Sequence, residues 1–352
     1  MNKQRQWVAE AIAKIQADFQ RSADTHLIKL DLPQWQGIDI YLKDESTHPT
    51  GSLKHRLARS LFLYALCNGK ITENTVVIEA SSGSTAVSES YFARLLGLRF
   101  IAVMAKSTSI QKINEITRYG GECFLVDSTD LIYAESERLA KELNGYYMDQ
   151  FTNAERATDW RGNNNIADSI FQQMKNEPHP VPSHLVMSAG TGGTSATLGR
   201  YIRYHQLDTE LTVVDPEHSV FYDYFLTGNR TLTESRCGLI EGIGRPRVEP
   251  SFIAPVIDCM MRISDKESIA TMLWLEKLIG RRVGASTGTN MMGVLKIAKK
   301  MHQKGQTGSI VTLLCDRGER YANSYYDKEW VAKYIGDISE QSLSVSDYLS
   351  TC

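Results

Sequence analysis

Long apolar segments are missing from this chain of 352 residues. None approaches the roughly 20 consecutive apolar residues that a helix needs to span a bilayer. The opening segment, MNKQRQWVAEAIAKIQADFQ, also lacks the continuous apolar core of a signal peptide. We therefore expect a cytoplasmic protein with no membrane partner.

A large excess of charge is missing as well, because the formal net charge is only -2. The lysine and arginine residues are scattered and form no basic cluster that would hold nucleic acid. A small molecule is therefore the expected partner, and nucleic acid is not.

Cysteine is scarce and widely spaced. The sequence has no Cys-x-x-Cys pair and no histidine at the spacing of metal ligands, so it predicts neither a metal site nor a disulfide framework. Most of the cysteines lie in apolar runs, which is typical of reduced core residues. They are Cys67, Cys123, Cys237, Cys259, Cys315 and Cys352.

Short β-rich runs alternate with helix-length amphipathic segments along most of the chain. The run IDIYLK is followed by a helical pattern at 53–68, and TVVIEA is followed by one at 84–97. The alternation continues to the late run SIVTLLC, with further helices expected at 109–119, 130–143, 194–206, 266–279 and 289–303. This order predicts βαβ units, and hence an α/β fold with mainly parallel sheets.

Three segments lie outside this alternation. At the N-terminus, apolar residues from Trp7 to Phe19 recur at helical spacing and predict a helix that packs along one stripe. Residues 149–180 are polar and loop-like before one further helix, which indicates a crossing between lobes. The segment GDISEQSLSVSDYLSTC at the end is weakly patterned and indicates a tail.

The length and the 42% hydrophobic content are sufficient for a large core divided between two lobes. We expect a smaller lobe built from residues 45–150 and a larger lobe built from residues 1–44 and 151–352. Ligands of open α/β sheets bind beyond the carboxyl ends of the strands, so the loops that follow strands are the places to search.

The loop SAGTGGTSA at 188–196 follows one predicted strand and precedes a helix. Its glycines at 190, 192 and 193 allow backbone N–H groups to close around an anion, and the helix start adds partial positive charge. The loop therefore predicts a phosphate site. A tight turn that binds nothing is the alternative.

The loop EASSGSTAVS at 79–88 also joins a strand to a helix. Its hydroxyls and its backbone donors suit a small carboxylate. The alternative is that Ser81 or Ser82 is only an N-cap.

Lys54, in THPTGSLKHR at 47–56, stands at a predicted helix start, where the helix dipole disfavours a cation. A single lysine is most often a solvated surface residue. Together with the two anion-binding loops, however, a lysine can form a Schiff base with a carbonyl compound. The three features together predict pyridoxal 5'-phosphate as cofactor and an amino acid as substrate.

Two of the glycine-containing segments also allow other interpretations. Gly284-x-Ser286-x-Gly288 imitates the nucleophile elbow of α/β-hydrolases, but no acidic residue lies between Ser286 and the single later histidine, so that interpretation fails. Gly190-x-Gly192 with Asp215 at the end of the next strand imitates a dinucleotide fingerprint. An NAD-dependent oxidoreductase therefore stays open as an alternative.

From about residue 25 to about residue 320, these motifs and their order resemble the fold-type II pyridoxal-phosphate enzymes. Within them, the chain resembles the cysteine synthase and cystathionine β-synthase group. The resemblance implies a fold like that of the tryptophan synthase β-subunit: two lobes, each with a mainly parallel twisted sheet flanked by helices, and the cofactor between them. It also implies a homodimer.

The resemblance assigns roles to particular residues. PTGSLKHR is similar to the family's lysine motif, which makes Lys54 the catalytic Schiff-base residue. SSGSTA and DQFTN are similar to its substrate segments, and the residues implied are Ser81, Ser82, Gly83, Thr85 and Gln150. The implied cofactor-binding residues are Lys54, Ser84, Gly190, Thr191, Gly192, Gly193, Thr194 and Ser286, the last of which would face the pyridine nitrogen.

The chain also departs from the family pattern. Ser84 replaces the usual asparagine near the cofactor ring, His55 replaces the usual aspartate after the lysine, and Ala154 replaces a usual proline. These changes argue against a standard O-acetylserine-dependent cysteine synthase. The whole pattern looks most like the branch of L-cysteine desulfhydrases.

The implied activity is that of a carbon–sulfur lyase. It would perform β-elimination on L-cysteine and release hydrogen sulfide, pyruvate and ammonia. A β-replacement enzyme and a non-catalytic binding protein with the same fold are the alternatives that remain beside the oxidoreductase.

Overall fold

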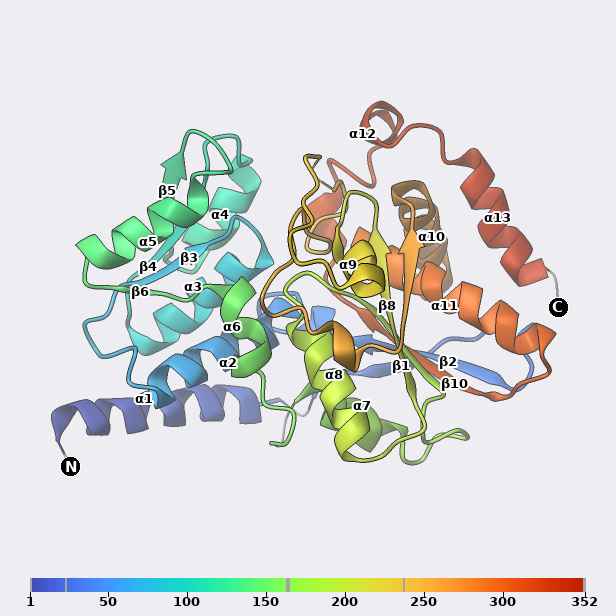
Figure 1. The fold of residues 1–352 in the computed structure, drawn as a ribbon, viewed down its shortest axis with the longest axis horizontal. Coiled ribbons are helices and arrows are strands. Elements are labelled where there is room, and N and C mark those ends of the chain that lie inside the picture. Colours follow the sequence, from blue (N-terminus) through green and yellow to red (C-terminus); the bar gives the residue numbers. More distant parts are fainter. Residues whose placement is uncertain (1, 23, 163–164, 237, 351–352) are drawn as a thin grey trace. The chain divides into compact units, whose positions relative to one another are not determined.

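The computed structural model describes residues 2–22, 24–162, 165–236 and 238–350. The chain divides into two compact units (Figure 1). The first unit contains Met1–Asp24 and His48–Thr158, and the second contains Thr25–Thr47 and Asp159–Cys352.

The first unit is built on a four-stranded parallel sheet with the strand order β5-β4-β3-β6. The strands are β3 (Val77–Ala80), β4 (Phe100–Ala105), β5 (Glu122–Val126) and β6 (Tyr146–Tyr147). The helices are α1 (Lys3–Gln20), α2 (Lys54–Cys67), α3 (Ser84–Leu96), α4 (Ile110–Arg118), α5 (Ile132–Glu142) and α6 (Gln150–Ala157).

Both faces of this sheet are covered by apolar side chains. Along β4, Phe100 and Met104 pack in a cluster with the helices α1, α2 and α3, whereas Ile101 and Val103 pack with Leu139 of α5. Alternate residues of a strand point to opposite faces, so a strand that is buried on both sides reads as one continuous apolar run. The run RFIAVM has this composition for that reason.

The N-terminal helix α1 belongs to the first unit, whereas the sequence had assigned residues 1–44 to the larger lobe. The reason is its apolar stripe: Ala11 and Ile15 are buried in the same cluster as Leu57, Leu61 and Phe92. The boundaries between the two units also fall at Thr47/His48 and at Thr158/Asp159, whereas the sequence predicts that the lobes change at residues 45 and 151.

The second unit is built on a six-stranded sheet with the order β1-β2-β10-β7-β8-β9. Only β1 (Leu27–Lys29) is antiparallel to its neighbour among the described strands. The others are β2 (Ile38–Asp44), β7 (His184–Ser188), β8 (Glu210–Pro216), β9 (Cys259–Ile263) and β10 (Gly308–Leu314). The helices are α7 (Ile166–Met174), α8 (Gly193–Tyr204), α9 (Phe221–Thr227), α10 (Asp265–Ile279), α11 (Ala285–Gln303), α12 (Lys328–Tyr334) and α13 (Ser339–Ser350).

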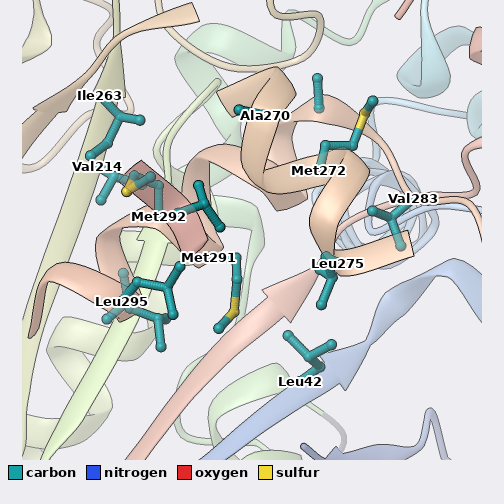
Figure 2. Packing of buried hydrophobic residues seen from close by; sticks show 14 of the residues in the cluster. Leu42, Val214, Ile263, Ala270, Met272, Leu275, Val283, Met291, Met292 and Leu295 are labelled. Carbon is teal, nitrogen blue, oxygen red and sulfur yellow. The ribbon is translucent and has the colours of Figure 1, made fainter. Parts of the chain in front are cut away.

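The main core of the second unit lies where α11 packs against the sheet and α10 packs against α11. Figure 2 shows Met291, Met292 and Leu295 of α11 among side chains of the sheet, such as Leu42 and Val214. Helix α11 contacts β7, β8, β9 and β10. Because it lies across these strands, the position of its first turn is fixed relative to the ends of those strands.

These two sheets confirm the predicted α/β fold with mainly parallel strands. Three local predictions were wrong. Helix α11 begins at Ala285 instead of 289, and the segment 149–180 contains two helices, α6 and α7. The final residues are not a loose tail, because Val345 of α13 is buried in the core beside α10.

No helix within the described residues is long and apolar enough to cross a membrane. Cys67, Cys123, Cys259 and Cys315 form no disulfide among the described residues. Cys67 is exposed and the other three are half-buried, so these four cysteines are not the core residues that the sequence predicts. Cys237 and Cys352 lie outside the part of the chain that is described.

Replacement of Ile15 by alanine tests the assignment of α1 to the first unit. Ile15 is fully buried, so the loss of its side chain should lower the free energy of unfolding by about 2–4 kcal/mol in urea titrations. The control is Lys14→Ala on the exposed face of the same helix, which should change that free energy by less than about 0.5 kcal/mol. Equal effects of the two substitutions would contradict the assignment.

Candidate active site

Lys54 is the first residue of α2, as the sequence predicts. The tight turn before it has Gly51 at φ 76°, and the Gly51 N–H donates to the His48 carbonyl at 2.8 Å. The residue before Lys54, Leu53, offers no side chain that caps the helix. Lys54 is half-buried at this point, so it is not a fully solvated surface lysine.

The substrate loop, defined here as residues 81–85, joins the end of β3 to the start of α3. The N-cap of α3 is Gly83, so neither Ser81 nor Ser82 serves as an N-cap. The Ser81 hydroxyl instead accepts a hydrogen bond from the Gly83 N–H at 3.2 Å. A helix that begins at glycine has no capping side chain at that residue, which leaves its first N–H groups for an anion.

Gln150 is the first residue of α6, and it is buried next to the substrate loop. The Thr85 hydroxyl donates to Gln150 Oε1 at 2.8 Å. The Gln150 backbone N–H donates to Glu79 Oε2 at 3.1 Å. Two segments that lie far apart in the sequence, SSGSTA and DQFTN, are therefore joined by a direct contact.

Two fully buried carboxyl groups lie behind the substrate loop and were missed by the sequence analysis. Burial raises the pKa of Glu79 to about 8, even though two backbone N–H groups donate to this carboxyl. Burial, with the Glu79 carboxyl nearby, also raises the pKa of Glu89 well above its ordinary value. Glu89 has no hydrogen-bond partner among the described residues. A glutamate inside the apolar run TVVIEA is unusual, and this feature of the sequence could have indicated Glu79.

In the second unit, the phosphate loop, defined here as residues 190–194, follows β7. Helix α8 begins at Gly193, and its N-cap is Gly192 with φ 87°. A Cβ atom at Gly192 would lie 2.5 Å from the Ser251 carbonyl oxygen and 2.7 Å from the Phe252 Cα. Only glycine fits both this backbone conformation and this close approach.

Ser286 lies in the first turn of α11, whose N-cap is again a glycine, Gly284. The Thr287 hydroxyl accepts the N–H of Cys315 at 3.0 Å, immediately after β10 ends. Strands β10 and β7 are parallel neighbours, so their carboxyl ends lie at the same edge of the sheet. The phosphate loop and Ser286 therefore lie at one edge of one sheet, as the predicted roles require.

The structure also decides two competing interpretations. Gly284-x-Ser286-x-Gly288 follows helix α10 and a short loop, not a strand, so it is no nucleophile elbow. Asp215, the acid of the dinucleotide interpretation, is fully buried and accepts the Tyr222 N–H at 2.9 Å. It therefore presents no exposed carboxylate to a ribose, and an NAD site is not supported.

The residues present fit pyridoxal 5'-phosphate. The substrate loop, the phosphate loop and the loop before Ser286 lead to α3, α8 and α11, and the N-cap of each of these helices is glycine. Helix α2, which begins at Lys54, has Leu53 at its N-cap. At α1, α6, α7, α10 and α12, by contrast, the N-cap side chain accepts a hydrogen bond from the helix. The helix starts at the motif loops thus offer N–H groups to anions such as phosphate and carboxylate. No group of His, Cys, Asp and Glu suited to a metal occurs among the described residues.

The sequence profile of the family described as "Pyridoxal-phosphate dependent enzyme" matches residues 20–316. The chain belongs to this family, and the predicted cofactor is thereby confirmed.

The chain is also similar to individual enzymes of this kind. The chain is 55% identical to the L-cysteine desulfhydrase Cds1 of Mycobacterium tuberculosis, over 99% of this chain and 96% of that protein. It is 30% identical to cysteine synthase B of Campylobacter jejuni, over 82% of this chain and 91% of that protein. The solved structure of an O-acetylserine dependent cystathionine beta-synthase from Helicobacter pylori has a TM-score of 0.73 and 26% identity, covering 89% of this chain and 97% of that one.

Replacement of Gly192 by alanine should reduce cofactor affinity at least tenfold, because the new Cβ atom would displace the phosphate loop from Ser251. Titration of the cofactor-free protein with pyridoxal phosphate, followed by visible absorption, measures this affinity. The control is Gly228→Ala, which has a similar φ of 68° but no atom within 4 Å of the new Cβ. Unchanged affinity in the Gly192 variant would refute the role of the loop.

Replacement of Glu79 by glutamine should flatten the pH dependence of stability. With a folded-state pKa of about 8, the folded chain holds an extra proton between roughly pH 5 and pH 8. The free energy of unfolding therefore falls as the pH rises through this window, by at most about 1.4 kcal/mol per pH unit for each such proton.

Urea unfolding of the wild type and the variant at about pH 5.5 and about pH 7.5 measures this fall. It should be smaller in Glu79→Gln, whereas Glu73→Gln at an exposed position should leave it as in the wild type. The same fall in all three proteins would show that Glu79 ionises normally.

Proposed function

We propose that this chain is an L-cysteine desulfhydrase. It converts L-cysteine and water into hydrogen sulfide, pyruvate and ammonia. The observation that carries the proposal is the 55% identity to the M. tuberculosis desulfhydrase over 99% of this chain. The geometry of the motif loops supports the same class, because it provides anchors for a phosphate and for an amino-acid carboxylate.

The cofactor would be held by the phosphate loop and by Lys54. The N–H groups of the phosphate loop, residues 190–194, would bind its phosphate, and Lys54 would hold it covalently. Ser84 and Ser286 would lie near its ring. When bound, pyridoxal phosphate supplies an electron sink that stabilises negative charge at the amino-acid Cα.

The substrate carboxylate would bind at the start of α3. Ser81, Ser82 and Gly83 precede a helix start without a capping side chain. The Gly83 N–H, which donates to the Ser81 hydroxyl, would turn to the carboxylate when the substrate binds. Because the Thr85 hydroxyl donates to Gln150 Oε1, Thr85 would orient the Gln150 side chain, whose amide N–H would reach the carboxylate. The two residues would thus act together.

The chain's own groups would then move the protons. The amine of Lys54, released when the amino group of the substrate displaces it, would remove the α-proton as general base. The sulfur would leave with the electron pair of its bond to Cβ. Ser286 has no negative charge that would keep a nearby pyridine nitrogen protonated. A weaker electron sink would favour prompt loss of the leaving group over reprotonation at Cα.

Two further properties belong to this proposal. We propose a homodimer, as the family resemblance implies, and a cytoplasmic location. Sedimentation of the purified protein and fractionation of cells that express it would test these two properties separately.

The proposed activity is tested with L-cysteine as sole substrate. Sulfide and pyruvate should be released in equal amounts, because one elimination yields one of each. If sulfide appears without pyruvate, or only when a second nucleophile is supplied, the enzyme performs β-replacement instead. If neither product forms, the desulfhydrase proposal is wrong.

Replacement of Lys54 by alanine should lower the rate of sulfide release at least a thousandfold, because the chain loses both its covalent anchor and its general base. The matched control is Lys70→Ala, an exposed lysine just beyond the end of α2, which should keep the wild-type rate. A normal rate in the Lys54 variant would remove this residue from the mechanism.

A further inference from the structure

A histidine follows the proposed catalytic lysine and is buried. The side chain of His55 is only 7% exposed, although it stands in the first turn of a helix. Its ring stacks on His48 with 5.1 Å between centroids, and it lies 4.8 Å from the ring of Phe92 and 5.1 Å from that of Tyr91. The aromatic surroundings fix the plane of the imidazole.

The imidazole begins a chain of hydrogen bonds between two segments. Nδ1 of His55 lies 3.1 Å from the Thr50 hydroxyl, which lies 2.8 Å from the Ser88 hydroxyl. Thr50 is in the turn that precedes Lys54, and Ser88 is on α3, one helical turn beyond Ser84. Ser88 is fully buried, so its hydroxyl depends on partners within the protein.

A second hydrogen bond, between Thr85 and Gln150, joins the substrate loop to α6. Thr85 and Ser88 are three residues apart on one helix, so they lie on neighbouring parts of its surface. The first turn of α3 is thus tied to α6 by Thr85 and to the Lys54 turn by Ser88. A shift of the Thr50 hydroxyl would break this hydrogen bond between the Lys54 turn and α3.

We propose that the chain His55–Thr50–Ser88 positions the Lys54 turn relative to the substrate loop, and that His55 is a positioning residue for the reaction. The inference rests on the proposed roles of Lys54 and of residues 81–85. Proton removal by Lys54 depends on its distance from the bound amino acid, so a displacement of the turn should lower kcat.

The first test uses variants of Thr50, which is half-buried. Thr50→Val keeps the shape and removes the hydroxyl, so kcat for L-cysteine should fall about tenfold while cofactor occupancy, read from the visible absorption, stays unchanged. Thr50→Ser keeps the hydroxyl and should stay within about twofold of the wild type. A role in stability alone would lower the melting temperature and leave kcat of the loaded protein unchanged, which would overturn the proposal.

The second test asks whether the three residues act as one chain. His55→Phe keeps the ring contacts and removes Nδ1, so its effect combined with Thr50→Val should equal that of either variant alone. Additive effects would overturn the proposal. If His55→Phe does not fold, Ser88→Ala combined with Thr50→Val gives the same comparison.

Hydrogen–deuterium exchange separates this proposal from the proposed function. Thr50→Val should increase exchange in both residues 48–56 and residues 81–88, whereas Thr50→Ser should not. If the wild type releases no sulfide, the proposed function fails, but this exchange pattern still supports the positioning chain. Exchange that increases in only one of the two segments would overturn it.

Discussion

The first N–H groups of an α-helix have no carbonyl partner within the helix. At α3, α8 and α11 the chain places glycine at the N-cap, so no N-cap side chain satisfies these groups. At α1, α6, α7, α10 and α12 the same chain uses Asn, Asp or Ser for this purpose, including a full capping box at Ser264, whereas α2, α4, α5 and α9 also begin without a capping side-chain hydrogen bond. The motif helices thus retain N–H donors that an anion can satisfy, and the remaining features of the site support that arrangement.

Uncapped helix starts need support from tertiary contacts. At α8, Gly192 approaches the backbone of Ser251 and Phe252 more closely than any side chain would permit. At α11, Thr287 accepts the N–H of Cys315 at the end of β10. At α3, the Thr85 hydroxyl donates a hydrogen bond to Gln150. The contact at α3 is a buried hydrogen bond, the contact at α11 is a partly buried one, and the contact at α8 is a close approach of backbone atoms. Each of them restricts the position of its loop.

Much of this arrangement could be predicted from sequence because it is local. The alternation of strands and helices, the loops that follow β3 and β7, and the place of Lys54 at a helix start all depend on neighbouring residues. The family and its cofactor followed from the order of these motifs along the chain.

The rest depends on contacts between distant segments. The start of α11 reads as GASTGTN, which is poor in strong helix formers, and the helix begins there because Thr287 and Asn290 bond to the end of β10. The unit to which α1 belongs depends on where Ile15 is buried. The hydrogen bond between Thr50 and Ser88 cannot be predicted from neighbouring residues, because Ser88 belongs to α3.

We propose that the uncapped start of α8 binds the cofactor through its phosphate group. The most direct test compares the affinity of the cofactor-free protein for pyridoxal 5'-phosphate with its affinity for pyridoxal, which has the same aldehyde and no phosphate. Both can be followed by visible absorption. The account predicts that pyridoxal binds at least a hundredfold more weakly, because only the phosphate reaches the N–H groups of α8. Equal affinities would contradict it.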